Sequence, residues 1–509
     1  MSAPASHALE PDASFDGGDL DCGNGLLLLI RKHIDPLPRG GLLGILSTEI
    51  SVDEDLPAWC RLTGNELVSF TKDGKQRSFL VCKGKLEERG HHTARVQAST
   101  PRVTKSIDEP LPRPIEPVPF KPIPPLAVTS IGSWPRPRWM IEAMHAHIEG
   151  RLDEVSFQET ANDAVRLAIA AQERSGIGII TDGEQRRDSY ASFVATRLEN
   201  CQLIPLTDLL PLVDDPEDFE RELRALDVPA ADVRHPAVFG PIRRQVPLAT
   251  HELQFARTVT DKPIKVALPG PYLLTRTMWL ECLSERTYET REQLAEDIVR
   301  VLREELADLL YWGATLVQFD EPVLSEVVFS GSKSKRSFMC GALSESLGPE
   351  QELGFARDLI NAVVQGFPRE RIAVHMCRGN WTPDESVALA GSYLPLIGTL
   401  RGMNVGAYLL EMCTPRAGEM DVLRSLPADA RIGIGVVNQK HADVEGDDAV
   451  AAKIAEAINL FGADRVLLHP DCGFATFADN PICSASIAEA KLAAITRAAA
   501  RFNRPKTSL

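Results

Sequence analysis

The chain has 509 residues, of which 44% are hydrophobic and 25% are charged, an ordinary composition for a folded protein of several domains. Its 55 basic and 71 acidic side chains give a net charge of −16, so we expect no nucleic-acid partner, because phosphate backbones require a basic surface. The N-terminus lacks a basic segment followed by an apolar one, and no apolar run approaches the ~20 residues that cross a bilayer. These features predict a cytoplasmic protein without membrane contact.

The N-terminal region predicts a small α/β unit. Residues 1–12 are expected to form a flexible tail and residues 13–88 a compact α/β sandwich. The expected elements are a helix over Gly25–Ile34, a strand over Leu42–Ser47, a helix starting at Asp53–Asp55 and a strand near Ser78–Cys82.

A cysteine, Cys22, stands directly before the first of these helices. There the positive end of the helix dipole favours a thiolate. The unit resembles the TusA-like sulfur-carrier fold, and the resemblance implies that Cys22 is a candidate sulfur carrier. That family has Cys-Pro-x-Pro where this chain has Cys22-Gly23-Asn24-Gly25, so a docking role is the alternative.

A proline-rich segment follows the N-terminal unit. Nine prolines fall within Pro101–Pro125, and proline can neither continue a helix nor donate to a β-ladder. We therefore predict an extended linker over residues 89–125, followed by a large domain over residues 126–505.

The large domain repeats a short apolar run followed by a segment of helical periodicity. Continuous apolar runs indicate parallel strands buried on both faces, and Arg291–Tyr311 and Asp447–Phe461 are amphipathic helices of the kind that cover them. The long interval after the second run predicts an excursion with a hairpin at Val238–Gln245. Eight runs predict a (β/α)8 TIM barrel: Leu126–Trp134, Gly176–Glu184, Ile264–Tyr272, Thr315–Leu324, Ile372–Arg378, Gly406–Cys413, Arg431–Asn438 and Arg465–Cys472.

Polar residues stand at the ends of these runs. The carboxyl ends of barrel strands open on one shared pocket, so we expect these side chains to meet there, although any single one is also explained as a turn former. They are Ser133, Glu184, Asp320, Glu321, His375, Cys377, Glu411, Asn438, Asp471 and Cys472.

A His-x-Cys pair indicates a metal site. Strand alternation sends His375 and Cys377 to the same side, and zinc prefers imidazole and thiolate ligands. Glu411 and Cys472 would complete the ligand set from other strand ends. A buried cysteine beside a core histidine is the alternative without metal. Spacing does not choose among the competing cysteines, which are Cys340, Cys413 and Cys483.

Several motifs occur in an order that resembles the catalytic barrel of cobalamin-independent methionine synthase. They are SIGSWP, ITDGEQRRD, LPGPY, VQFDEPVL, HMCRGN, GIGVVN and HPDCGF, and the match covers about residues 126–500. The resemblance implies zinc on His375, Cys377, Glu411 and Cys472. It also implies that five residues hold the amino-acid part of a thiol acceptor, namely Ile131, Gly132, Ser133, Glu184 and Asp320. Pairing of the two acids with Arg186 or Arg187 is the structural alternative.

The reaction that this resemblance implies is transfer of a methyl group from a methylfolate or methylcorrinoid donor to a homocysteine-like thiol, giving methionine. Zinc would keep the thiol ionised and nucleophilic. Lys440 stands where the family has a proton-donating histidine, and His441 follows it, so both are candidate proton donors.

Two alternatives to this function remain. Lys440 and the HMCRGN wording also resemble epoxyalkane:coenzyme M transferase, which makes a zinc-dependent thiol alkyltransferase the first. The second is a sulfur-relay protein acting through Cys22. A sulfur-carrier or corrinoid protein is the expected protein partner.

Overall fold

The fold is taken from a computed structural model, which describes residues 7–89, 122–205, 234–280, 287–329, 347–379, 385, 388–479 and 481–502. No helix in these ranges is long and apolar enough to cross a membrane.

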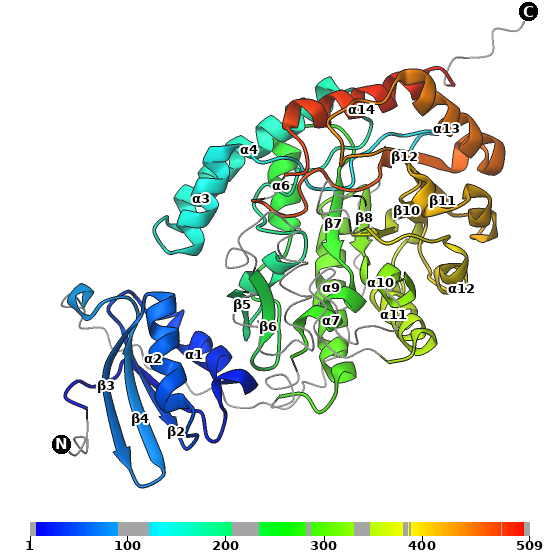
Figure 1. The fold of residues 1–509 in the computed structure, drawn as a ribbon. Coiled ribbons are helices and arrows are strands. Elements are labelled where there is room, and N and C mark those ends of the chain that lie inside the picture. Colours follow the sequence, from blue (N-terminus) through cyan, green and yellow to red (C-terminus); the bar gives the residue numbers. More distant parts are fainter. Residues whose placement is uncertain are drawn as a thin grey trace, which may run out of the picture.

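The N-terminal unit is a four-stranded sheet with two helices on one face (Figure 1). A single π-helical turn, Cys22–Leu26, precedes the first helix, so regular α-helix begins two residues later than predicted. The strands lie in the order β1-β2-β4-β3, and only β1 and β2 are parallel. The elements are β1 (Ala13–Asp16), α1 (Leu27–Ile34), β2 (Leu42–Ser47), α2 (Val52–Thr63), β3 (Glu66–Asp73) and β4 (Gln76–Cys82).

Residues 7–12, part of the segment predicted as a flexible tail, lie along the sheet and contact it. The two ring nitrogens of His7 hydrogen bond to the hydroxyls of Ser69 and Ser78 at 2.6 and 2.8 Å. Asp12 pairs with Arg89 at 2.7 Å, so tertiary hydrogen bonds and an ion pair order this segment. Most of the predicted linker, residues 90–121, falls outside the described residues.

The large domain contains a six-stranded parallel sheet in the order β12-β11-β10-β9-β8-β7. Each strand lies within one of the predicted apolar runs, and the mixed α/β fold with a parallel sheet is confirmed. The strands are β7 (Lys265–Pro269), β8 (Leu316–Asp320), β9 (Ile372–Met376), β10 (Ala407–Leu410), β11 (Arg431–Val437) and β12 (Val466–Pro470).

Two further segments continue the sheet from β12 back to β7 through single parallel bridges. Val128 pairs with Leu468 of β12, and the next residue, Thr129, pairs with Ile179. Ile180 then pairs with Ile264, directly before β7. The eight predicted runs thus form a closed ring, although the first two are too irregular to count as strands. Small and aliphatic side chains, including Ala127, Leu316, Ala373 and Leu467, fill one end of its interior.

Helices surround the sheet, as Figure 1 shows for α13 and α14 beside β11 and β12. The predicted helices over Arg291–Tyr311 and Asp447–Phe461 are confirmed to the residue as α9 and α13. The others are α3 (Arg138–Ile148), α4 (Glu154–Arg174), α6 (Thr250–Val259), α7 (Pro271–Met278), α10 (Val323–Phe329), α11 (Pro349–Val364), α12 (Ile397–Arg401) and α14 (Ala485–Ala500).

The hairpin predicted at Val238–Gln245 is wrong. The excursion does contain a hairpin, but it pairs β5 (Cys201–Pro205) with β6 (Arg234–Val238). Residues 238–245 pair with the chain before β5 rather than with one another: the N–H of Phe239 donates to the carbonyl of Asn200 at 2.9 Å, and Arg244 forms a bridge with Leu198. The chain between the two strands lies outside the described residues.

This hairpin contacts the N-terminal unit through α1 (Figure 1). Gln202 of β5 donates hydrogen bonds to the carbonyl of Arg31 at 3.1 Å and to the carboxylate of Asp35 at 3.2 Å. The ammonium of Lys32 donates to the carbonyl of Phe239 at 3.2 Å and stands over its ring. The two units therefore meet through a polar contact rather than a shared core.

Candidate active site

Three of the four predicted metal ligands form a tight group. Cys377, Glu411 and Cys472 each offer a ligand atom within 4.8 Å of the other two. The two sulfurs lie 3.5 Å apart, and Nε2 of His375 lies 3.9 Å from the sulfur of Cys472. The residues come from the ends of β9, β10 and β12. His375 and Cys377 stand two apart at the end of β9, and both approach the sulfur of Cys472, as expected for side chains on the same side of a strand.

The donor set fits zinc. Ligand atoms at 2.0 to 2.3 Å from a tetrahedral ion lie roughly 3.3 to 3.8 Å from one another, which is close to both distances just given. Two sulfurs, one imidazole nitrogen and one carboxylate oxygen are atoms that zinc accepts. In the described part of the chain no other group of three such residues converges, so neither Cys413 nor Cys483 competes; Cys340 lies outside it.

Neighbouring groups orient these ligands. Nδ1 of His375 hydrogen bonds to the carbonyl of Leu409 at 3.0 Å, which leaves Nε2 as the lone-pair atom facing Cys472. Burial lowers the pKa of His375 to about 3 and so keeps the ring neutral. Glu411 accepts from the backbone N–H of Arg378 at 2.7 Å and lies 3.4 Å from Arg416. In the metal-free chain, burial followed by the charge of Cys377 raises the pKa of Glu411.

A pocket joins this group to the predicted acceptor residues. Two carboxyl groups from separate strand ends face it. Its lining residues are Ile131, Ser133, Glu184, Tyr190, Asp320, Pro322, His375, Cys377, Cys472, Gly473 and Thr476.

Glu184 is held in an unusual backbone conformation. Its φ is +54°, a left-handed value that a residue with a side chain rarely adopts, and such strain concentrates at functional sites. Its Oε2 is buried and has no hydrogen-bond partner among the described residues. Arg187 lies 4.0 Å from Glu184 but pairs with Glu252 at 2.6 Å, and Arg186 binds Gln158. The structural alternative is thus met in part, because Arg187 lies within ion-pair distance of Glu184 although its shorter contact is with Glu252.

Asp320 is also buried, and it accepts a hydrogen bond from the side-chain amide of Gln318 at 2.6 Å. Burial, and then the charge of Glu184, raise the pKa of Asp320 to about 8. Both effects arise from an acidic pocket with little solvent, which is the setting in which a cationic ligand is bound most strongly.

The Ile131–Gly132–Ser133 segment forms part of the pocket wall, with Ile131 and Ser133 among the lining residues. A Cβ on Gly132 would lie 2.0 Å from Oε1 of Glu184, and one on Gly473 would lie 2.2 Å from the Oγ of Ser133. The backbone therefore approaches Glu184 on one side and the Cys472–Gly473 turn on the other, at distances that only glycine permits.

Comparison with known proteins identifies the family. Residues 126–206 and 225–495 match the family model described as "Cobalamin-independent synthase, Catalytic domain". The chain belongs to the cobalamin-independent synthase family.

Relatives of this synthase domain include a methionine synthase from Saccharolobus solfataricus, 24% identical over 69% of this chain and 89% of the relative. A methionine synthase from Sulfolobus acidocaldarius is 26% identical, over 68% of this chain and 85% of the relative. The fold is similar to that of a B12-independent methionine synthase from Shewanella sp. W3-18-1 solved in complex with selenomethionine. That structure has a TM-score of 0.57 and 22% identity, covering 74% of this chain and 98% of its own.

The two candidate proton donors of the synthase domain lie beside Glu385 and do not line the pocket. The ammonium of Lys440 is buried, 4.0 Å from the carboxylate of Glu385. His441 is 3.5 Å from the same group, with 54% of its side chain exposed. Burial lowers the pKa of Lys440, opposed by the charge of Glu385, and a lowered pKa makes its proton easier to donate.

Cys22 packs against the core of the N-terminal unit. Burial, then the charges of Asp55 and Asp21, raise the pKa of its thiol to about 12. These effects oppose the helix-dipole argument, and they leave Cys22 protonated and poorly nucleophilic at neutral pH.

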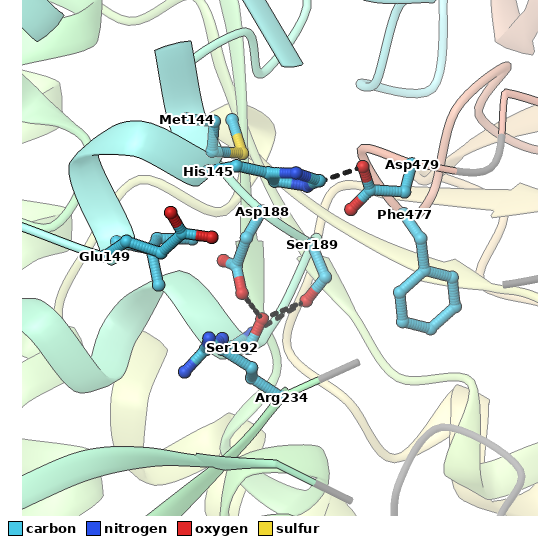
Figure 2. Close-up of a pocket in the computed structure, with 10 residues that line it drawn as sticks. Met144, His145, Glu149, Asp188, Ser189, Ser192, Arg234, Phe477 and Asp479 are labelled. Carbon is cyan, nitrogen blue, oxygen red and sulfur yellow. Dashed lines mark hydrogen bonds and ion pairs between the residues drawn. The ribbon is translucent and has the colours of Figure 1, made fainter. Parts of the chain in front are cut away.

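Sequence reasoning missed a second hollow, which lies near the pocket. Neighbouring residues line the two spaces: Ser189 and Phe477, which form a bridge, line the hollow, whereas Tyr190 and Thr476 line the pocket. Figure 2 shows two polar groups facing this hollow. In the first, the hydroxyl of Ser192 hydrogen bonds to the carboxylate of Asp188 and to the hydroxyl of Ser189. In the second, His145 lies 2.7 Å from the carboxylate of Asp479.

Sequence reasoning also missed Lys265, whose side chain is 1% exposed inside the barrel. The available signal was a lysine within an otherwise apolar run, Ile264–Tyr272, which argues that its ammonium has buried partners.

Proposed function

We propose that the chain transfers a methyl group to the thiol of homocysteine, giving methionine, with zinc as its cofactor. Membership of the cobalamin-independent synthase family and relatives named methionine synthase support this reaction. The observation that carries the proposal is a single pocket lined by His375, Cys377 and Cys472 on one side and by Glu184 and Asp320 on the other.

The charges around the pocket favour an acceptor with an amine. Glu184 and Asp320 are anionic when ionised, and the described residues that line the pocket include no lysine or arginine. A homocysteine ammonium would find two carboxylate partners, whereas the sulfonate of a coenzyme M-type acceptor would lack a cationic one. This contrast favours methyl transfer to an amino-acid thiol over the alkyltransferase alternative.

The chemistry divides between the cofactor and the protein. Bound zinc supplies a thiolate at neutral pH by stabilising the ionised acceptor sulfur. Glu184 and Asp320 bind the acceptor ammonium, and the backbone of residues 131–133 orients its amino-acid part, so that sulfur meets the methyl carbon in line. A sulfur–carbon bond forms as the bond from the methyl group to the donor nitrogen or cobalt breaks. A folate nitrogen then needs a proton, for which Lys440 and His441 are the candidates.

The proposal is tested by methionine formation. Zinc-loaded protein is incubated with homocysteine and either methyltetrahydrofolate or methylcobalamin, and methionine is measured by mass spectrometry. We expect methionine from at least one donor, and the productive donor identifies the methyl source. Chelated protein is the control. Lack of methionine with both donors, in protein that binds zinc, would contradict the proposed function.

For the N-terminal unit we propose a docking role rather than sulfur transfer. The raised pKa of Cys22 and the polar contact of α1 with the β5–β6 hairpin support this assignment. A TusA-like fold for the unit remains part of the proposal.

A further inference from the structure

The side-chain amine of one buried lysine contacts two residues that adjoin the lining of the acceptor pocket. Lys265 opens β7, and its Nζ donates to the carbonyl of Ser130 at 2.5 Å and to Oε1 of Gln318 at 2.6 Å. Ser130 directly precedes the Ile131–Ser133 segment. Lys265 is therefore anchored to the backbone that approaches the acceptor.

Gln318 extends this connection to Asp320. Residues 318 and 320 lie two apart on β8, so both side chains project from the same face of the strand. Because Oε1 of Gln318 accepts from Lys265, its Nε2 is the atom that donates to Oδ1 of Asp320, at 2.6 Å. Gln318 is fully buried, so water does not compete for either bond.

A second contact holds the same backbone segment. The hydroxyl of Thr181 donates to the carbonyl of Gly132 at 3.0 Å and lies 3.2 Å from the hydroxyl of Ser130. The Ser130–Gly132 backbone is thus fixed from the Lys265 side and from the Thr181 side. Among the described residues, the Lys265 connection is the one that also reaches Asp320, through Gln318 on the adjacent strand.

We infer that Lys265 is a positioning residue for the acceptor's ammonium, acting through Gln318 on Asp320 and through Ser130 on the neighbouring backbone. The inference rests on the proposed function. Burying a lysine side chain costs free energy, because its charged form loses its hydration. A positioning role beside the acidic pocket explains why this chain keeps a lysine there. A lysine that merely fills space would not need to join these particular partners.

Two substitutions break the connection at different bonds. Lys265→Met keeps the length of the side chain and removes both donors. Gln318→Glu keeps an acceptor for Lys265 but removes the N–H that Asp320 accepts, and it places a second carboxylate beside the first. Lys262→Met is the matched control, because Lys262 also donates to a backbone carbonyl, that of Ile177 at 3.0 Å, outside the pocket.

The assay compares homocysteine with 4-mercaptobutanoate, which is the same thiol acid without the amine. Wild-type methyl transfer and zinc content are measured first, so that failure of the proposed function is seen before any variant is made. We expect Lys265→Met and Gln318→Glu each to raise KM for homocysteine about tenfold or more, because this is the typical cost of losing a hydrogen bond to a charged group. KM for 4-mercaptobutanoate, zinc content and kcat should change by less than about twofold.

A structural role predicts a different result. If Lys265 only supports the barrel, both acceptors lose activity equally, and that result would overturn the inference. Should Lys265→Met fail to fold, Gln318→Glu alone decides, because it removes no buried cation. An unchanged KM for homocysteine in folded Gln318→Glu would also overturn the inference.

Discussion

The closest approach in the pocket provides a sharp test of its geometry. Gly132→Ala adds a Cβ that would lie 2.0 Å from Oε1 of Glu184 and 3.1 Å from its Cδ. Ordinary contact begins at 3.4 Å, so the carboxylate must retreat by about 1.4 Å. Gly132 has no positive φ, so alanine itself fits the backbone and the protein is expected to fold.

Displacing a substrate-binding carboxylate by more than 1 Å is expected to lower the catalytic rate strongly. A misplacement of this size typically lowers rates about 100-fold, which corresponds to about 2.7 kcal/mol in the transition state. We therefore expect kcat/KM for homocysteine to fall by about two orders of magnitude, with zinc content unchanged because Gly132 approaches none of the metal ligands.

The assay is steady-state methyl transfer by zinc-loaded protein, with circular dichroism to verify folding. Gly178→Ala is the matched control, because a Cβ there meets only the carbonyl of Val128, at 4.0 Å. Gly178 precedes one of the same irregular barrel segments. Wild-type kcat/KM in folded Gly132→Ala would refute the argument that Glu184 binds the acceptor at this position.

Three further predictions concern the metal, the N-terminal cysteine and pH. Cys472→Ser and His375→Ala should each lose the bound zinc, about one ion per chain, while remaining folded; full zinc content in both variants would disprove the site. Cys22→Ser should leave methyl transfer unchanged, whereas a sulfur relay would require that thiol in every turnover. Because the raised pKa of Asp320 keeps it protonated at lower pH, methionine should bind more tightly as pH rises from about 6 to about 8. Calorimetry should show that Asp320→Asn weakens this dependence, and the part that remains comes from Glu184, whose pKa is also raised by burial.

The six regular strands of the large domain could be predicted because their signals are local. Continuous apolar runs indicate buried parallel strands wherever they occur, and α9 and α13 have helical periodicity over their whole length. The convergence of Cys377, Glu411 and Cys472 follows from one topological rule, that the carboxyl ends of barrel strands share a face.

Features that depend on contacts between distant residues were decided only by the tertiary structure. The pairing of β5 with β6 joins segments separated by a long stretch of chain, so no local pattern indicated the register. The helix start at Cys22 suggested a thiolate, but burial beside Asp55 and Asp21 reverses the direction of its pKa shift. Lys265 reads as a single charged residue in an apolar run, and only the folded ring brings Ser130 and Gln318 to its ammonium. The spacing of apolar residues in a helix or strand follows from the backbone geometry of that one segment. The burial and charge around a side chain depend instead on which distant residues the fold places beside it.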